Sequence, residues 1–133
     1  MRHIIIASHH YFAAGLKDTL EFIGGDLGII DVNAYVDGAL LEDQIADAFA
    51  SLGKQDEVLI LTDMMQGSVC QAFMPYMGEK VFLVAGVNLP SALELAISKR
   101  EYTPSYIEEV LNAARQQLVL LNNCSVEIGD DDE

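Results

Sequence analysis

The stretch Ile-Ile-Ile-Ala-Ser-His-His-Tyr-Phe-Ala-Ala-Gly-Leu, residues 4–16, joins an apolar run, a polar turn and the start of an amphipathic pattern. The β-branched run at its beginning is typical of a strand buried on both faces. After the turn, apolar residues recur at helical spacing until Gly24 and Gly25 end the pattern. The stretch therefore predicts the first strand–helix unit of a parallel sheet.

The same alternation continues along the chain. Further strands are predicted at residues 28–34, 58–61 and 81–85, and a weaker strand at 125–128. Helices are predicted at residues 41–52, 68–76, 89–97 and 105–121, with Ser68 as the N-cap of the second of these and Ser105 with Glu108 as a capping box for the last. This order predicts an α/β, doubly wound, flavodoxin-like parallel sheet with strand order 2-1-3-4.

Composition limits the function. The chain has 133 residues, of which 51% are hydrophobic, so we expect one packed domain over residues 1–128. The net charge of −14 disfavours nucleic acid and anionic membranes as partners but permits a basic protein. Residues 129–133 form an acidic segment that we expect to be a disordered tail.

No apolar stretch has the length of a signal peptide core or of the ~20 residues of a membrane-spanning helix. The two cysteines, Cys70 and Cys124, are too far apart in sequence for a zinc motif. We therefore expect a cytoplasmic protein with reduced thiols and no metal site.

Two loops carry the candidate reactive residues. In the predicted strand order, the first and third strands are neighbours at the topological switch point, where ligands bind beside the carboxyl ends of the strands. His9 follows the first strand and Asp63 follows the third, so we expect the two side chains to converge. A carboxylate that accepts a hydrogen bond from Nδ1–H of an imidazole leaves Nε2 with a free lone pair, a nucleophile suited to phosphorus.

The second loop leads into the helix that begins near Ser68. The free amides of Gly67, Ser68 and Val69 and the Ser68 hydroxyl are predicted to bind phosphate oxygens. Two simpler interpretations stay open: Asp63 caps its own loop, and Ser68 is an N-cap and nothing more. Met64 and Met65 lie in the same loop and are candidates for an apolar rim that contacts a protein partner.

Three segments resemble one known family. Residues 5–16 resemble the opening of the IIA component of mannose-family bacterial sugar phosphotransferase systems (EIIA). Residues 61–68, Leu-Thr-Asp-Met-Met-Gln-Gly-Ser, are similar to the second active-site segment of that family, and residues 85–90, Ala-Gly-Val-Asn-Leu-Pro, to a third. The resemblance covers residues 2–120, with the three segments in the family's order and spacing.

The resemblance implies a phosphotransferase that takes a phosphoryl group from the phosphocarrier HPr onto His9 and passes it to a IIB component. IIB then serves sugar uptake through the membrane components IIC and IID. The resemblance also implies that Asp63 is the partner of His9 and that Ser68 lies beside the phosphate. It further implies a homodimer in which a C-terminal antiparallel edge strand is exchanged. Because the donor is another protein, no cofactor is expected. No linker to a second domain follows, so we expect a free-standing IIA subunit.

The chain departs from the family at a few positions. His10 stands where the family usually has Gly, and the turn Gln66–Gly67–Ser68–Val69 lacks the family's first Gly and its Pro. These differences leave open a regulatory module that binds partners and passes nothing on. A second alternative is a IIA-type subunit that donates phosphate to a dihydroxyacetone kinase, although residues 85–90 are more similar to the mannose type.

Overall fold

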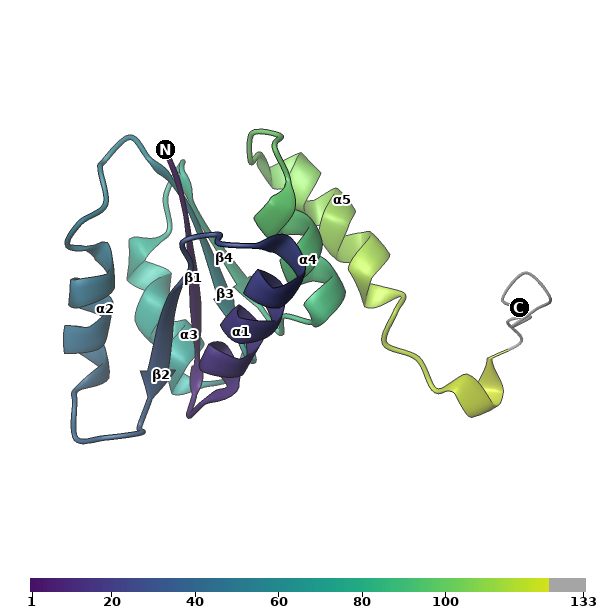
Figure 1. Cartoon of the computed structure of the whole chain (residues 1–133), viewed down its shortest axis with the longest axis horizontal. Coiled ribbons are helices and arrows are strands. Elements are labelled where there is room, and N and C mark those ends of the chain that lie inside the picture. The colour runs from purple at the N-terminus through teal and green to yellow at the C-terminus, as the bar shows by residue number, and fades with distance from the viewer. Residues whose placement is uncertain (125–133) are drawn as a thin grey trace.

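The sheet has the predicted strand order. The computed structural model describes residues 1–124, and in it four parallel strands lie in the order β2-β1-β3-β4. Their bounds are β1 (Arg2–His9), β2 (Ile30–Ala34), β3 (Glu57–Thr62) and β4 (Val81–Ala85). All three pairings are parallel, so the carboxyl ends of the strands meet at one edge, which is the lower edge in Figure 1.

Five α-helices cover the two faces of the sheet. Figure 1 shows α1 (Phe12–Gly24), α4 (Leu89–Ile97) and α5 (Pro104–Arg115) on one face, and α2 (Leu41–Phe49) and α3 (Ser68–Phe73) on the other. Two short 3₁₀ turns, η1 (Met74–Tyr76) and η2 (Leu121–Asn123), complete the described chain. This is the doubly wound, flavodoxin-like α/β architecture that the sequence predicts.

The core consists of two apolar layers separated by the sheet. In β1, Ile4 and Ile6 pack into the layer beneath α1, α4 and α5, whereas Ile5 and Ala7 pack into the layer beneath α2 and α3. All four side chains are almost completely buried. The central strand is therefore apolar on both faces, which explains its continuous rather than alternating hydrophobic pattern.

The structure corrects several local predictions. The N-cap of α3 is Gly67 rather than Ser68, and the N-cap of α5 is Thr103, whose hydroxyl accepts from the amide of Tyr106, rather than Ser105. The last helix ends at Arg115, so Leu118 and Leu121 are exposed instead of packed. The predicted strand 125–128 and the acidic tail 129–133 lie outside the described residues.

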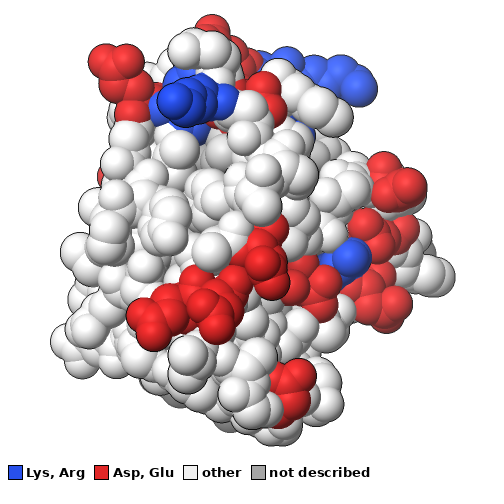
Figure 2. Space-filling model, turned by 90° about the vertical axis from the view of Figure 1, so that its left-hand side faces the viewer, with Lys and Arg blue, Asp and Glu red and all other residues white. Residues whose placement is uncertain are grey.

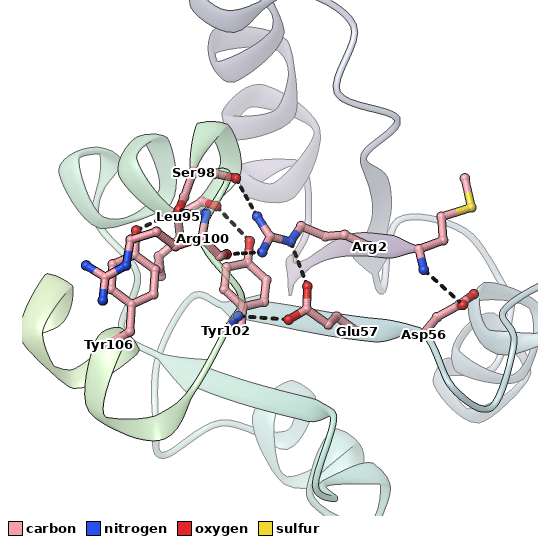
Figure 3. A network of polar contacts seen from close by, with 9 residues as sticks. Arg2, Asp56, Glu57, Leu95, Ser98, Arg100, Tyr102 and Tyr106 are labelled. Carbon is pink, nitrogen blue, oxygen red and sulfur yellow. Dashed lines mark hydrogen bonds and ion pairs between the residues drawn. The ribbon is translucent and has the colours of Figure 1, made fainter.

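At the amino-terminal end of the sheet, Arg2 joins β1 and β3 to the loop between α4 and α5 (Figure 3). Its Nε donates to Oε1 of Glu57 at 3.1 Å, and its terminal nitrogens donate to the carbonyls of Ser98 and Arg100. The guanidinium also lies 3.7 Å from the centroid of the Tyr102 ring. One side chain thus connects segments nearly one hundred residues apart in the chain, as the span from Arg2 to Arg100 illustrates.

Tyr102 anchors the same loop from its other side. Its amide donates to Oε2 of Glu57 at 2.8 Å, and its hydroxyl donates to the carbonyl of Leu95 at 2.7 Å (Figure 3). Burial raises the pKa of Tyr102 to about 12, so the hydroxyl remains a hydrogen-bond donor at all physiological pH values. The loop that precedes α5 is therefore held by polar contacts as well as by the apolar core.

We expect Arg2→Ala to lower the free energy of unfolding by about 2–3 kcal/mol, because the partly buried Glu57 carboxylate loses its cation and two carbonyls lose their donor. For a domain of this size the loss corresponds to a fall of about 10 °C in the melting temperature. Thermal and urea denaturation measure it, with Lys99→Ala as a control that removes an exposed cation from the same end of the molecule. Equal stability of the two variants would contradict a structural role for the network.

Candidate active site

His9 is the last residue of β1 and stands in register with Ala34, the last residue of β2. The turn that follows is tied down by Ser8, which is fully buried. The Ser8 hydroxyl donates to the carbonyl of His10 at 2.9 Å and accepts from the amide of Ala13 at 2.7 Å. Ser8 therefore links the end of β1 to the first turn of α1 and fixes the direction in which His9 leaves the sheet.

His10 occupies the left-handed region, with φ of +58°, and its amide donates to the carbonyl of Ala34 at 2.8 Å. A residue with a Cβ is strained in this region, whereas Gly is not. The geometry explains why Gly suits this position and why His10 is an uncommon choice. The His10 ring lies edge-on to Tyr11, with 4.9 Å between ring centroids.

His9 and Asp63 meet, as the predicted topology requires. Asp63 directly follows β3, the neighbour of β1, and one of its oxygens, Oδ2, accepts two hydrogen bonds from His9. The backbone amide donates at 2.8 Å and ring Nδ1 also lies at 2.8 Å. Because a carboxylate accepts, Nδ1 is the donor of this hydrogen bond, and in the neutral tautomer the lone pair is on Nε2.

The electrostatics of the pair favour an ionised carboxylate. Burial alone raises the pKa of Asp63, but the hydrogen bonds from the His9 amide and ring outweigh it and hold the pKa below its ordinary value. The other oxygen, Oδ1, accepts from the amide of Met64 at 3.0 Å. The His9 side chain is 35% exposed and that of Asp63 is 16% exposed, so the carboxylate lies beneath a ring that solvent can reach.

Gly67 lies against the ring of His9. A Cβ built on Gly67 would be 2.8 Å from Cε1 of His9, closer than real carbon contacts allow. The absence of a side chain thus permits the start of α3 to approach the imidazole at the carbon between its two nitrogens. Ser68, the first residue of α3, follows directly, and the first amides of a helix have no partner within the helix.

Tyr35 is a site residue that the sequence analysis missed. It follows β2, has φ of +68°, and places its hydroxyl 2.6 Å from Oγ of Ser68. Its ring centroid is 5.8 Å from that of His9, and the planes are tilted by 42°. The sequence signal that was available is its position at the carboxyl end of the predicted second strand, which lies beside the strand that ends at His9.

The surroundings of the imidazole are apolar and exposed. Phe12, the first residue of α1, and Met64 and Met65, from the loop after β3, are each about half exposed or more. Exposed apolar side chains grouped around a reactive residue are typical of a surface that binds another protein. Met64 and Met65 are therefore exposed, and their role as a rim that contacts a protein partner stays a prediction.

The chain contains a second pairing of an imidazole with a carboxylate, at the opposite end of the sheet. Nε2 of His3 lies 2.8 Å from Oδ2 of Asp56, and this hydrogen bond is the main reason that the pKa of Asp56 falls to about 2. The His3 side chain is only 15% exposed. The two pairs have the same contact distance, but only the one at His9 lies at the carboxyl ends of the strands.

Comparison with known proteins gives one family match. The family model of the PTS system fructose IIA component, EIIA-man, matches residues 3–114. The matched region contains His9, Asp63, Gly67 and Ser68, and it ends one residue before the end of α5.

Solved structures agree with this match. A protein assigned to a phosphoenolpyruvate-dependent sugar phosphotransferase system (PTS) permease from Klebsiella pneumoniae is 34% identical, with a TM-score of 0.84 and 92% of each chain covered. The mannose/sorbose-specific IIA subunit from Enterococcus faecalis is 23% identical, with a TM-score of 0.76 over 95% of this chain and 98% of that one. The PTS IIA protein associated with the fucose utilization operon of Streptococcus pneumoniae is 24% identical, with a TM-score of 0.68 over 91% and 93%.

Proposed function

The chain belongs to the EIIA-man family of IIA components of the sugar phosphotransferase system, and from this premise we propose that it relays a phosphoryl group from HPr, through Nε2 of His9, to a IIB component. The observation that carries the proposal is the double hydrogen bond from His9 to Oδ2 of Asp63, at 2.8 Å from both the amide and ring Nδ1. It holds the ring in the tautomer that has its free lone pair on Nε2, on a side chain that solvent reaches.

The proposed step is a displacement at phosphorus. The lone pair of Nε2 forms the new bond to phosphorus, while the bond from phosphorus to the donor breaks and its electron pair stays on the donor. The ring then carries a positive charge, which the ionised carboxylate of Asp63 stabilises through the Nδ1 proton. Transfer onward reverses the sequence: the acceptor takes the phosphoryl group and the electron pair returns to Nε2.

Gly67 and Ser68 are proposed to bind the phosphoryl oxygens. The close approach of Gly67 to the imidazole brings the beginning of α3 beside the reacting atom. Amides at a helix start, together with the Ser68 hydroxyl, offer donors to an anion.

The net charge of the protein supports protein partners of opposite charge. Figure 2 shows the side of the molecule on which α2 lies in Figure 1. Most of the Lys and Arg visible there lie at the upper end, with some Asp and Glu beside them, and further Asp and Glu form a band lower on the face. With a net charge of −14, the protein attracts basic partners electrostatically, while the apolar rim supplies contact area.

We place the reaction in the cytoplasm, with the membrane components IIC and IID acting only after IIB. Cys70 and Cys124 are free thiols, which suits a reducing compartment. None of the helices within residues 1–124 is long and apolar enough to cross a membrane.

We further propose that the protein acts as a homodimer. Within residues 1–124, β4 pairs only with β3, and a groove of about 710 Å³ runs between β4 and α5. The segment 118–121 is apolar and exposed, and Figure 1 shows the chain after α5 leading away from the domain. A second copy that covers β4 with this part of the chain would bury both surfaces.

Sedimentation equilibrium is expected to give twice the chain mass at micromolar concentration, because a strand edge and apolar chain are both covered on pairing. Truncation after Gln117 is expected to give a monomer that still contains β1 to β4. A full-length chain that stays monomeric at high concentration would contradict the dimer and leave the relay untouched.

The relay is tested by incubation with HPr that carries radioactive phosphate. We expect the protein to become labelled, and we expect the label to survive alkali and to be released by acid, as a phosphorus–nitrogen bond requires. A chase with a IIB component should then remove it. If a dihydroxyacetone kinase subunit removes the label and IIB does not, the protein is a phosphoryl donor for that kinase. A label that no acceptor removes would favour a regulatory module.

A further inference from the structure

Tyr35 combines a strained backbone with a short contact into the proposed site. Its φ of +68° is uncommon for a residue with a bulky side chain, because the Cβ is strained in the left-handed region. The side chain is 53% exposed, so burial of the ring does not explain the conformation. Its hydroxyl lies 2.6 Å from Oγ of Ser68, and its ring lies beside that of His9.

The hydroxyl pair has a preferred direction. The two hydroxyl oxygens lie 2.6 Å apart, and the phenol, as the stronger acid and better donor, favours the direction from Tyr35 to Oγ of Ser68. The Ser68 hydroxyl makes no other hydrogen bond to a residue of the described chain. Its own proton is then free to point at an anion next to the start of α3, the segment that touches His9 through Gly67.

We propose that Tyr35 is a positioning residue for phosphoryl transfer: its hydroxyl donates to Ser68 and directs the Ser68 proton toward the phosphoryl group on His9. The inference rests on the function proposed above and deepens that function, because it names a residue that orients the Ser68 hydroxyl. No proton changes owner in this arrangement. The phenolic proton stays on Tyr35, the Ser68 proton stays on Ser68, and the hydrogen bond to the phosphoryl oxygen stabilises the negative charge there.

The test is a double-mutant cycle on phosphoryl uptake from phosphorylated HPr, with Tyr35→Phe, Ser68→Ala and both together. We expect Tyr35→Phe to lower the maximal rate roughly tenfold, the effect of one hydrogen bond, with the KM for HPr unchanged. Ser68→Ala is expected to lower the rate at least as much. In the Ser68→Ala background, Tyr35→Phe should have no further effect, because Tyr35 acts through Ser68.

Tyr76→Phe is the matched control, since it removes the hydroxyl of a partly exposed tyrosine that stacks on Phe49, and we expect wild-type rates. A Tyr35→Phe rate within twofold of wild type, or effects of Tyr35→Phe and Ser68→Ala that multiply in full, would overturn the positioning role. Failure of the wild-type protein to take up any phosphoryl group would instead overturn the proposed function. The two failures are therefore distinct.

Discussion

His9→Ala is expected to take up no phosphoryl group from HPr, a loss of at least about 10³-fold, because the variant has no nucleophile at the carboxyl end of β1. The fold should persist, since the His9 ring is 35% exposed and lies at the end of a strand whose core residues are unchanged. Gel electrophoresis after incubation with radioactive phosphorylated HPr measures the uptake, and circular dichroism checks the fold.

The chain supplies two controls for this experiment. His3→Ala removes the imidazole of the other imidazole–carboxylate pair, 2.8 Å from Asp56, and should leave uptake unchanged. His10→Gly removes the adjacent imidazole at a backbone position that Gly adopts without strain, and it should retain the label. If His9→Ala is still labelled and His10→Gly is not, the phosphorylated residue is His10 and the assignment to His9 is wrong.

Asp63→Asn is expected to slow phosphoryl uptake by about 10²- to 10⁴-fold while leaving a protein that folds. An asparagine amide has no charge to stabilise the phosphorylated ring, and it can also turn its NH₂ group toward Nδ1, which moves the ring proton to Nε2 and blocks the nucleophile. Rapid quenching of the reaction with phosphorylated HPr gives the rate constant. KM should change little, because Asp63 lies beneath the ring rather than on the docking surface.

Asp56→Asn is the matched control, because Asp56 accepts from His3 at the same 2.8 Å but at the opposite end of the sheet. It should transfer at the wild-type rate. Equal rates for Asp63→Asn and Asp56→Asn would remove Asp63 from the mechanism.

Asp63 also makes the stability of the fold depend on pH. Because the pKa of Asp63 is lowered in the folded state, its contribution to stability is present above the pKa of the unfolded chain and is lost as the pH falls through the folded pKa.

The sequence was sufficient for the strand order and for the meeting of His9 with Asp63. Continuous apolar runs mark strands buried on both faces, and right-handed crossovers leave few ways to order four parallel strands. Once β1 and β3 are neighbours, residues at their carboxyl ends must lie close together. The pairing of His9 with Asp63 follows from the strand order, which can be predicted from the hydrophobic pattern of the sequence without knowledge of the loop conformations.

Details of the backbone were less predictable. Ser68 and Ser105 have the right chemistry for caps, but Gly67 and Thr103 are the residues with extended φ and ψ angles just before the helices. Which residue adopts that conformation depends on tertiary contacts, such as the approach of Gly67 to His9. Tyr35 was missed for a similar reason: no sequence pattern predicts a tyrosine in the left-handed region, and its contact with Ser68 joins two separate loops.

The most direct measurement is nuclear magnetic resonance of the phosphorylated protein with ¹⁵N-labelled histidine, which identifies the nitrogen that is bonded to phosphorus. We expect a single phosphohistidine, at residue 9, with phosphorus coupled to Nε2 and a proton retained on Nδ1 opposite Asp63. Phosphorus on Nδ1 of His9, or on the ring of His3 or His10, would contradict the account, because the carboxylate would then face the wrong atom or the wrong residue.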